Sequence, residues 1–204
     1  MRTSAGRLPA PAGGGLPLER VGFDIDGVVA DIMTTFLEMA REVHGPHPFT
    51  LADITTFQLE ECLQLPPPLI RRLIRELIDR PHELPIRPLP QAVEVLTRLA
   101  QEAPLVFVTA RDRAAPIQLW LNRTLAPVPP RDIWVMATGD PEAKVRYLHT
   151  HAIEYFVEDR LETCFELARA GITPIVFAQP WNRRPHPFPE VHTWEELGAL
   201  LFGP

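Results

Sequence analysis

Cysteine is scarce in this sequence: only Cys62 and Cys164 are present, and they do not form a CxxC pair. We therefore expect two free thiols in a reducing cytoplasm. No run approaches about 18 consecutive apolar residues, so no membrane-spanning helix is expected, and no apolar segment of a secretory signal follows Arg2 and Arg7. Basic residues are not in excess either. The formal net charge of −6 argues against nucleic acid or an anionic membrane as the main partner.

The apolar residues that are present suffice for a substantial core. They make up 46% of 204 residues, which suits one domain, alone or with a small insert. Residues 1–19 are the exception: they are rich in Gly, Pro and Ala, bury little surface and are expected to form a disordered tail. Nearly continuous apolar runs predict strands covered on both faces at 20–24, 105–109, 133–137, 155–158 and 174–177.

Helical patterns lie between and after these runs. Apolar spacing, proline starts and N-cap residues predict helices at 31–43, near 52–63, at 67–80, from Pro90, from Asp140, at 161–170 and at 193–201. Alternating strands and helices predict an α/β fold, a Rossmann-like parallel sheet of about five strands. Helices alone fill residues 33–88, which we interpret as a small helical insert placed after the first strand. The core would then comprise 20–32 and 89–204.

Polar side chains stand where several predicted strands end. In an open parallel sheet, ligands bind beyond the carboxyl ends of the strands. Residues i and i+2 of an extended chain face the same way, so Asp24 and Asp26 can both point into one pocket. A close cluster of acids requires a cation, and oxygen ligands suit Mg²⁺. The groups expected at this edge are Asp24, Asp26, Thr109, Lys144, Glu158 and Asp159.

This set of residues fits phosphoryl transfer through an aspartyl-phosphate. Asp24 would attack phosphorus. Asp26 would protonate the leaving oxygen and later take a proton from the hydrolytic water. Thr109 would donate a hydrogen bond to the phosphoryl oxygens, and Lys144 would offset their charge. All four are predicted to be catalytic, and the last two also to bind substrate.

Four segments, FDIDGVVAD, VFVTAR, the region of Lys144 and YFVEDR, resemble the four motifs of the haloacid-dehalogenase superfamily. The resemblance implies a phosphatase, since dehalogenases lack the acid at Asp26, and a cap of the first, helical type. It also implies that Asp24, the backbone carbonyl of Asp26, and Asp159 hold Mg²⁺, with Glu158 as a fourth metal-site residue near a bound water.

Within that superfamily the sequence is most similar to the 5'(3')-deoxyribonucleotidase family. DGVVAD matches its DGVLAD, IRPLPQAVEVLTRL resembles the segment before its second motif, and HTWEEL resembles its closing helix. The chain departs from the family pattern at Thr109-Ala110-Arg111, where the family has Thr-Ser-Pro. It also has Ile32 where an aromatic residue is common, and Glu158 for the first Asp of an Asp-Asp pair.

The expected partner is a small phosphorylated metabolite, a nucleotide in the first instance. A sugar phosphate or another metabolite is the alternative substrate, and a non-catalytic phosphate- or metal-binding module is the alternative from another class. A homodimer is left open. Ala110, Arg111 and Arg160 are expected to contact substrate.

Other side chains have two interpretations. Asp31 is a helix N-cap or supports the site, and the arginines of 67–80 form a solvated face or a basic face toward substrate. Phe57 and Phe36 are core residues or stack on a base. The segment containing Trp181, Asn182 and Arg183 covers the core or closes the pocket.

Overall fold

The computed structural model describes residues 14–46 and 48–203, and its centre is a parallel sheet of six strands. The α/β prediction is confirmed. The sheet order is β3-β2-β1-β4-β5-β6, so the first strand lies in the middle. The strands are β1 (Val21–Phe23), β2 (Leu105–Thr109), β3 (Ile133–Ala137), β4 (Tyr155–Glu158), β5 (Thr173–Phe177) and β6 (Glu190–Val191). Five correspond to the predicted strands, and β6 was not predicted.

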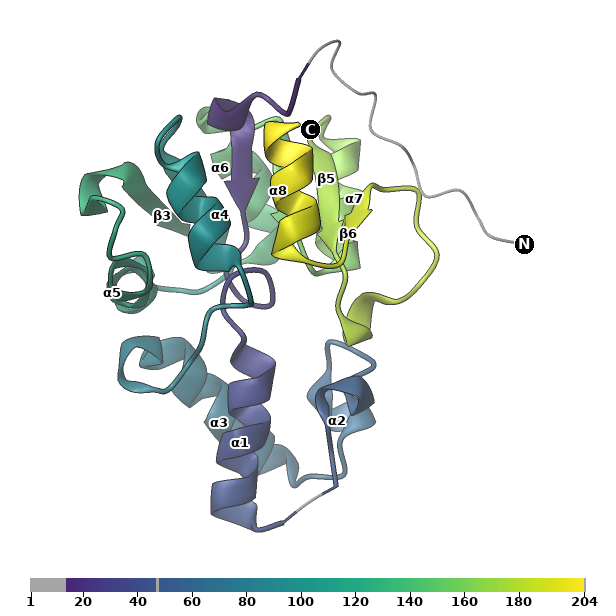
Figure 1. Cartoon of the computed structure of the whole chain (residues 1–204). Helices are drawn as coiled ribbons and strands as arrows, with labels where there is room; N and C mark the ends of the chain where they lie inside the picture. Colours follow the sequence, from purple (N-terminus) through teal and green to yellow (C-terminus); the bar gives the residue numbers. More distant parts are fainter. Residues whose placement is uncertain (1–13, 47, 204) are drawn as a thin grey trace.

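Helices cover both faces of this sheet (Figure 1). Alternate residues of β2 show why its sequence is continuously apolar. Phe107 packs in the cluster that includes α4 (Ala92–Leu99) and α8 (Trp194–Phe202), whereas Val106 packs in a second cluster with Leu148 of α6 (Lys144–Thr150). Trp194 of α8 stacks on Phe23 with ring centroids 5.7 Å apart. The other covering helices are α5 (Ala114–Thr124) and α7 (Leu161–Arg169).

The segment between β1 and β2 is helical and lies below the sheet in Figure 1. Its helices are α1 (Ile32–His44), α2 (Leu59–Cys62) and α3 (Pro67–Asp79), with 3-10 turns at Leu51–Asp53 and Pro81–Glu83. Asp31 is the N-cap of α1, since its Oδ1 accepts a hydrogen bond from Thr34 N at 3.2 Å. The apolar stripe of α3, Ile70, Leu73 and Leu77, is buried. We call residues 33–88 the insertion.

Two local expectations need correction, and one helix was not predicted. Residues 14–19 are not a disordered tail: Leu16 is buried at 5% exposure, and a 3-10 turn spans Leu18–Arg20. Residues 1–13 lie outside the described residues. The helix expected near 52–63 is only the four residues of α2. Helix α5 was not predicted, because Pro116 interrupts its pattern, although proline is tolerated in a first turn.

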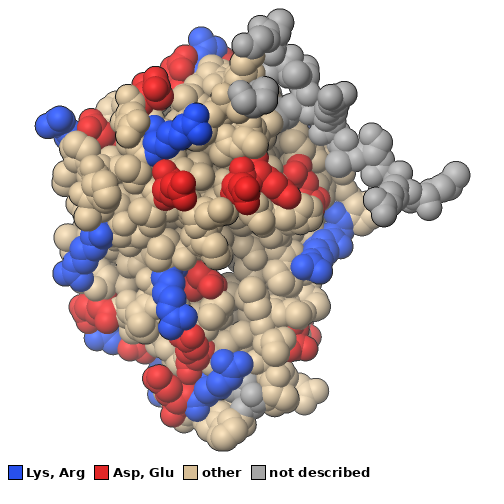
Figure 2. All heavy atoms as spheres, in the orientation of Figure 1, with Lys and Arg blue, Asp and Glu red and all other residues tan. Residues whose placement is uncertain are grey.

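The surface agrees with the balanced composition. Acidic and basic side chains are interspersed on the face shown in Figure 2, with no large area of one sign. Cys62 and Cys164 are both free. In the described part of the chain, no helix is both long and apolar enough to cross a membrane.

Candidate active site

The turn that follows β1 carries both acids of the DxDG motif. The amides of Val28, Val29 and Ala30 all donate to Ile25 O, which closes the turn. Gly27 has φ +77°, and a Cβ there would lie 2.2 Å from Asp159 Oδ2, so only glycine fits. Two distant side chains hold the turn: Gln179 Nε2 donates to Gly27 O at 2.6 Å, and Trp194 Nε1 donates to Val28 O at 2.7 Å.

Three buried carboxylates meet beside this turn. Asp24 from the end of β1, Glu158 from the end of β4 and the adjacent Asp159 each offer an oxygen within 4.8 Å of the others. Lys144, the first residue of α6, places Nζ 3.0 Å from Asp24 Oδ1 and 2.7 Å from Glu158 Oε2. The predicted strand ends therefore deliver their acids to one place, as parallel strands in one sheet must.

Burial and the charges of neighbouring groups shift the pKa values of Asp24, Asp159 and Lys144. Burial raises the pKa of Asp24 to about 7, although Lys144 opposes the shift. Burial, then the charges of Glu158 and Asp24, raise the pKa of Asp159 well above its ordinary value. Burial alone would lower the pKa of Lys144, but the charges of Asp24 and Glu158 outweigh it and raise that pKa. Lys144 is thus a permanent cation inside the cluster.

The cluster fits a divalent cation. When all three carboxylates are ionised, Lys144 balances one of their charges, and the two that remain in this buried place match a divalent cation. Asp24 Oδ1 is buried and, apart from its ion pair with Lys144, has no hydrogen-bond partner among the described residues. Both oxygens of Glu158 already accept hydrogen bonds, from Arg160 N at 3.1 Å and from Lys144. Asp24 and Asp159 are therefore better placed than Glu158 to ligate a metal directly.

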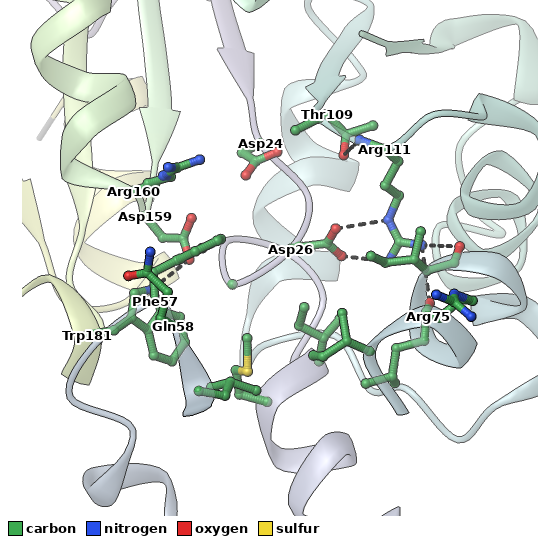
Figure 3. A pocket seen from close by; sticks show the side chains of 18 of the residues that line it. Asp24, Asp26, Phe57, Gln58, Arg75, Thr109, Arg111, Asp159, Arg160 and Trp181 are labelled. Carbon is green, nitrogen blue, oxygen red and sulfur yellow. Dashed lines mark hydrogen bonds and ion pairs between the residues drawn. The ribbon is translucent and has the colours of Figure 1, made fainter. Parts of the chain in front are cut away.

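Asp26 points to the other side of the turn (Figure 3). Its two oxygens accept hydrogen bonds from Arg111, Oδ2 from Nε at 2.9 Å and Oδ1 from Nη2 at 2.7 Å. Arg111 follows β2 by two residues, and its Nη1 donates to Leu77 O and Ile78 O of α3. The guanidinium expected to contact substrate is thus already engaged within the protein.

The remaining predicted residues also reach this region. The hydroxyl of buried Thr109 accepts a hydrogen bond from Arg111 N at 3.3 Å, so its own proton is left for another acceptor. Ala110 lines the same space. The guanidinium of Arg160 lies 4.9 Å from the ring centroid of Phe57.

A cavity of about 680 Å³ lies between the acidic cluster and the insertion and is lined by residues of both. All nine predicted site residues line it. Phe57, 46% exposed, lines it from the insertion, whereas Phe36 is a fully buried core residue. Gln58, which the sequence did not single out, also lines it. Of the arginines in the segment 67–80, Arg71 and Arg75 are exposed and line the cavity from one face of α3, since they are four residues apart.

The loop after β5 closes one wall. Trp181 Nε1 donates to Asp159 Oδ2 at 2.9 Å, and Asn182 Nδ2 donates to Asp159 O at 2.7 Å. Trp181 also lines the cavity. These two residues therefore do more than cover the core: they orient Asp159.

The family model for the 5' nucleotidase, deoxy (Pyrimidine), cytosolic type C proteins (NT5C) matches residues 18–202. The chain belongs to this family. It is a hydrolase of the haloacid-dehalogenase and nucleotidase type, and the superfamily expected from the four motifs is confirmed.

Relatives of this NT5C-family chain extend over nearly its whole length. "Putative nucleotidase BH1399" of Halalkalibacterium halodurans is 27% identical over 192 residues, 90% of this chain and 92% of that protein. A haloacid-dehalogenase family hydrolase of Deinococcus radiodurans, with bound phosphate and sodium, superposes with a TM-score of 0.57 at 17% identity, covering 92% and 99% of the two chains. The structure of YfnB of Bacillus subtilis, bound to magnesium, superposes with a TM-score of 0.56 at 17% identity and covers 89% of this chain and 97% of YfnB. These two structures establish the fold.

Proposed function

We propose that this chain is a Mg²⁺-dependent phosphomonoesterase that hydrolyses nucleoside monophosphates through an aspartyl-phosphate on Asp24. The observation that carries the proposal is the buried cluster at the end of β1. Asp24 faces the cavity beside Lys144, in a group of three carboxylates that, once ionised, carry two negative charges beyond the one that Lys144 balances. Asp26, the proton-transfer group, comes from the same turn and faces the same cavity.

In the first half of the reaction, an oxygen of Asp24 attacks phosphorus and the ester oxygen leaves. Asp26 delivers a proton to that oxygen, so the leaving group departs as an alcohol. The Thr109 hydroxyl and the Lys144 ammonium face the developing charge on the phosphoryl oxygens. In the second half, water attacks the aspartyl-phosphate, Asp26 takes its proton, and inorganic phosphate leaves.

Asp24, Asp159 and the backbone carbonyl of Asp26 would hold Mg²⁺, with Glu158 beside them. When bound, the ion supplies charge neutralisation between the Asp24 carboxylate and the phosphate that it approaches. Lys144 alone cannot provide this, because its charge is already shared between Asp24 and Glu158.

We extend the proposal to the substrate and to the insertion. Membership of the NT5C family supports a nucleotide. The exposed ring of Phe57 provides a stacking surface, and Gln58 beside it carries both a donor and an acceptor for the edge of a base. Residues 33–88 would act as a cap over the core formed by 20–32 and 89–204. A cytoplasmic location stays a prediction.

The experiment is phosphate release with Mg²⁺ from ribo- and deoxyribonucleoside 5'- and 3'-monophosphates, with sugar phosphates beside them. We expect the nucleotides to be preferred and a chelator to abolish release. Preference for a sugar phosphate would contradict the substrate assignment and leave the chemistry standing. Release that survives complete chelation would contradict the role of the metal.

Phe57→Ala tests the base contact. Loss of stacking costs about 1–3 kcal/mol per base, so KM for a nucleoside monophosphate should rise roughly 5- to 150-fold. The matched control is Phe165→Ala, an exposed aromatic of α7 outside the cavity that packs on Phe188. Equal KM values for the two variants would contradict a base on Phe57.

A further inference from the structure

We propose that Arg111 is a positioning residue that fixes the carboxylate of Asp26 and ties it to the C-terminal turn of α3. The inference rests on the proposed phosphatase function, in which Asp26 transfers protons. It replaces the expected role of Arg111 in substrate binding.

The guanidinium is almost fully used within the protein. Arg111 is 4% exposed. Of its five N–H groups, Nε and one of Nη2 donate to the two oxygens of Asp26, and both of Nη1 are taken by the carbonyls of Leu77 and Ile78. One N–H of Nη2 remains, which is too little for the bidentate grip that arginine uses on phosphate.

The bidentate contact defines where the Asp26 carboxylate lies. A single hydrogen bond would leave that carboxylate free to rotate, whereas two parallel bonds from a rigid planar donor fix both its position and its plane. Proton transfer requires heavy atoms at about 2.6–3.2 Å, so a small displacement of Asp26 from the ester oxygen is costly. The side chain that sets this distance is Arg111.

The same side chain continues into the insertion. Leu77 O and Ile78 O belong to the last turn of α3, where carbonyls lack partners within the helix and a cation is favourable. Helix α3 also lines the cavity with Ile74 and Arg75. Arg111 thus links α3, which forms one wall of the cavity, to Asp26, the proposed proton-transfer group.

The test compares kcat/KM of Arg111→Met for two esters, thymidine 5'-monophosphate and p-nitrophenyl phosphate. This ratio reports the steps up to transfer of phosphorus to Asp24. The nucleoside alkoxide needs protonation as it leaves, but p-nitrophenolate leaves without it. We expect a fall of roughly 10- to 100-fold for the nucleotide and a far smaller change for the aryl ester. Arg111→Lys keeps the charge without the fork and should recover part of the loss.

Arg113→Met is the matched control. Arg113 lies two residues further on and also reaches the end of α3, through Asp79 at 2.9 Å, but it is exposed and does not touch Asp26. It should leave both values of kcat/KM unchanged. Thermal unfolding of each variant shows whether activity is measured on folded protein.

Combining Arg111→Met with Asp26→Asn tests whether Arg111 affects kcat/KM through Asp26. If Arg111 acts through Asp26, the double variant is no slower than Asp26→Asn alone. Additive losses, an equal fall for both esters, or faster turnover by Arg111→Met would each overturn the assignment. No hydrolysis of either ester by the unmodified chain would instead overturn the proposed function, and this proposal with it.

Discussion

Replacing the proposed nucleophile by its neutral isostere, Asp24→Asn, should stabilise the metal-free protein while abolishing turnover. Asp24 is buried next to Glu158 and Asp159, and its pKa is raised from 3.8 to about 7. The folded protein therefore holds a proton that the unfolded chain releases between these values. As pH rises through that window, the free energy of unfolding of the metal-free protein falls.

The magnitude follows from the pKa. At 1.36 kcal/mol per pH unit, the raised value corresponds to about 4 kcal/mol lost by the folded state once Asp24 is ionised. This value already includes the attraction of Lys144, whose Nζ lies 3.0 Å from Asp24 Oδ1, so an asparagine, which cannot ionise, should recover most of the loss. We therefore expect a net gain of about 4 kcal/mol above pH 8, or roughly 8–16 °C in Tm for a chain of this size. The difference should shrink to roughly 2 kcal/mol at pH 5 and vanish only below the ordinary pKa of 3.8.

The assay is thermal unfolding of both proteins in a chelator from pH 5 to pH 9. The matched control is Asp112→Asn, which neutralises an exposed carboxylate on the rim of the same cavity and should leave Tm unchanged across the range. A variant no more stable than the wild type at pH 8, or a wild type whose Tm does not fall as pH rises from 5 to 8, would refute the reasoning.

Two further predictions concern the metal. Binding of Mg²⁺ must displace the proton of Asp24, so the rise in Tm on adding MgCl₂ should grow between pH 6 and pH 8; a rise independent of pH would show that Asp24 is not a ligand. Trp181→Phe removes the hydrogen bond to Asp159 and should weaken Mg²⁺ affinity about 10-fold by calorimetry. Trp120→Phe, which loses an indole bond to Ile86 O away from the cavity, should not.

The core of the fold and the acids of the site are predictable from sequence for one physical reason. Strands covered on both faces have nearly continuous apolar sequences, and the carboxyl ends of parallel strands lie at the same edge of the sheet. The first polar residues after such runs, Asp24 and Glu158, must therefore lie near each other. The structure places their carboxylates within 4.8 Å.

The rest depends on contacts that leave no periodic signal. Strand β6 is two residues long, too short for any pattern, and exists because it pairs with β5. The partner of Arg111 is Asp26, 85 residues earlier. Nothing near either residue records that ion pair, so an arginine beside a predicted phosphate site was expected to contact substrate. Only the folded structure shows that most of its donors are taken within the protein.

The turn after β1 is held by donors from the far end of the chain. Gln179 and Trp194 lie 152 and 166 residues after the carbonyls that they bind. A ribosome adds about 5–20 residues per second, so the turn is synthesised roughly 8–33 seconds before these donors exist. The central strand β1 is the first strand of the sheet to be synthesised, but the turn that follows it gains these two hydrogen bonds only when the chain is nearly complete. A nascent chain that ends before residue 179 carries both aspartates without the side chains that shape their turn.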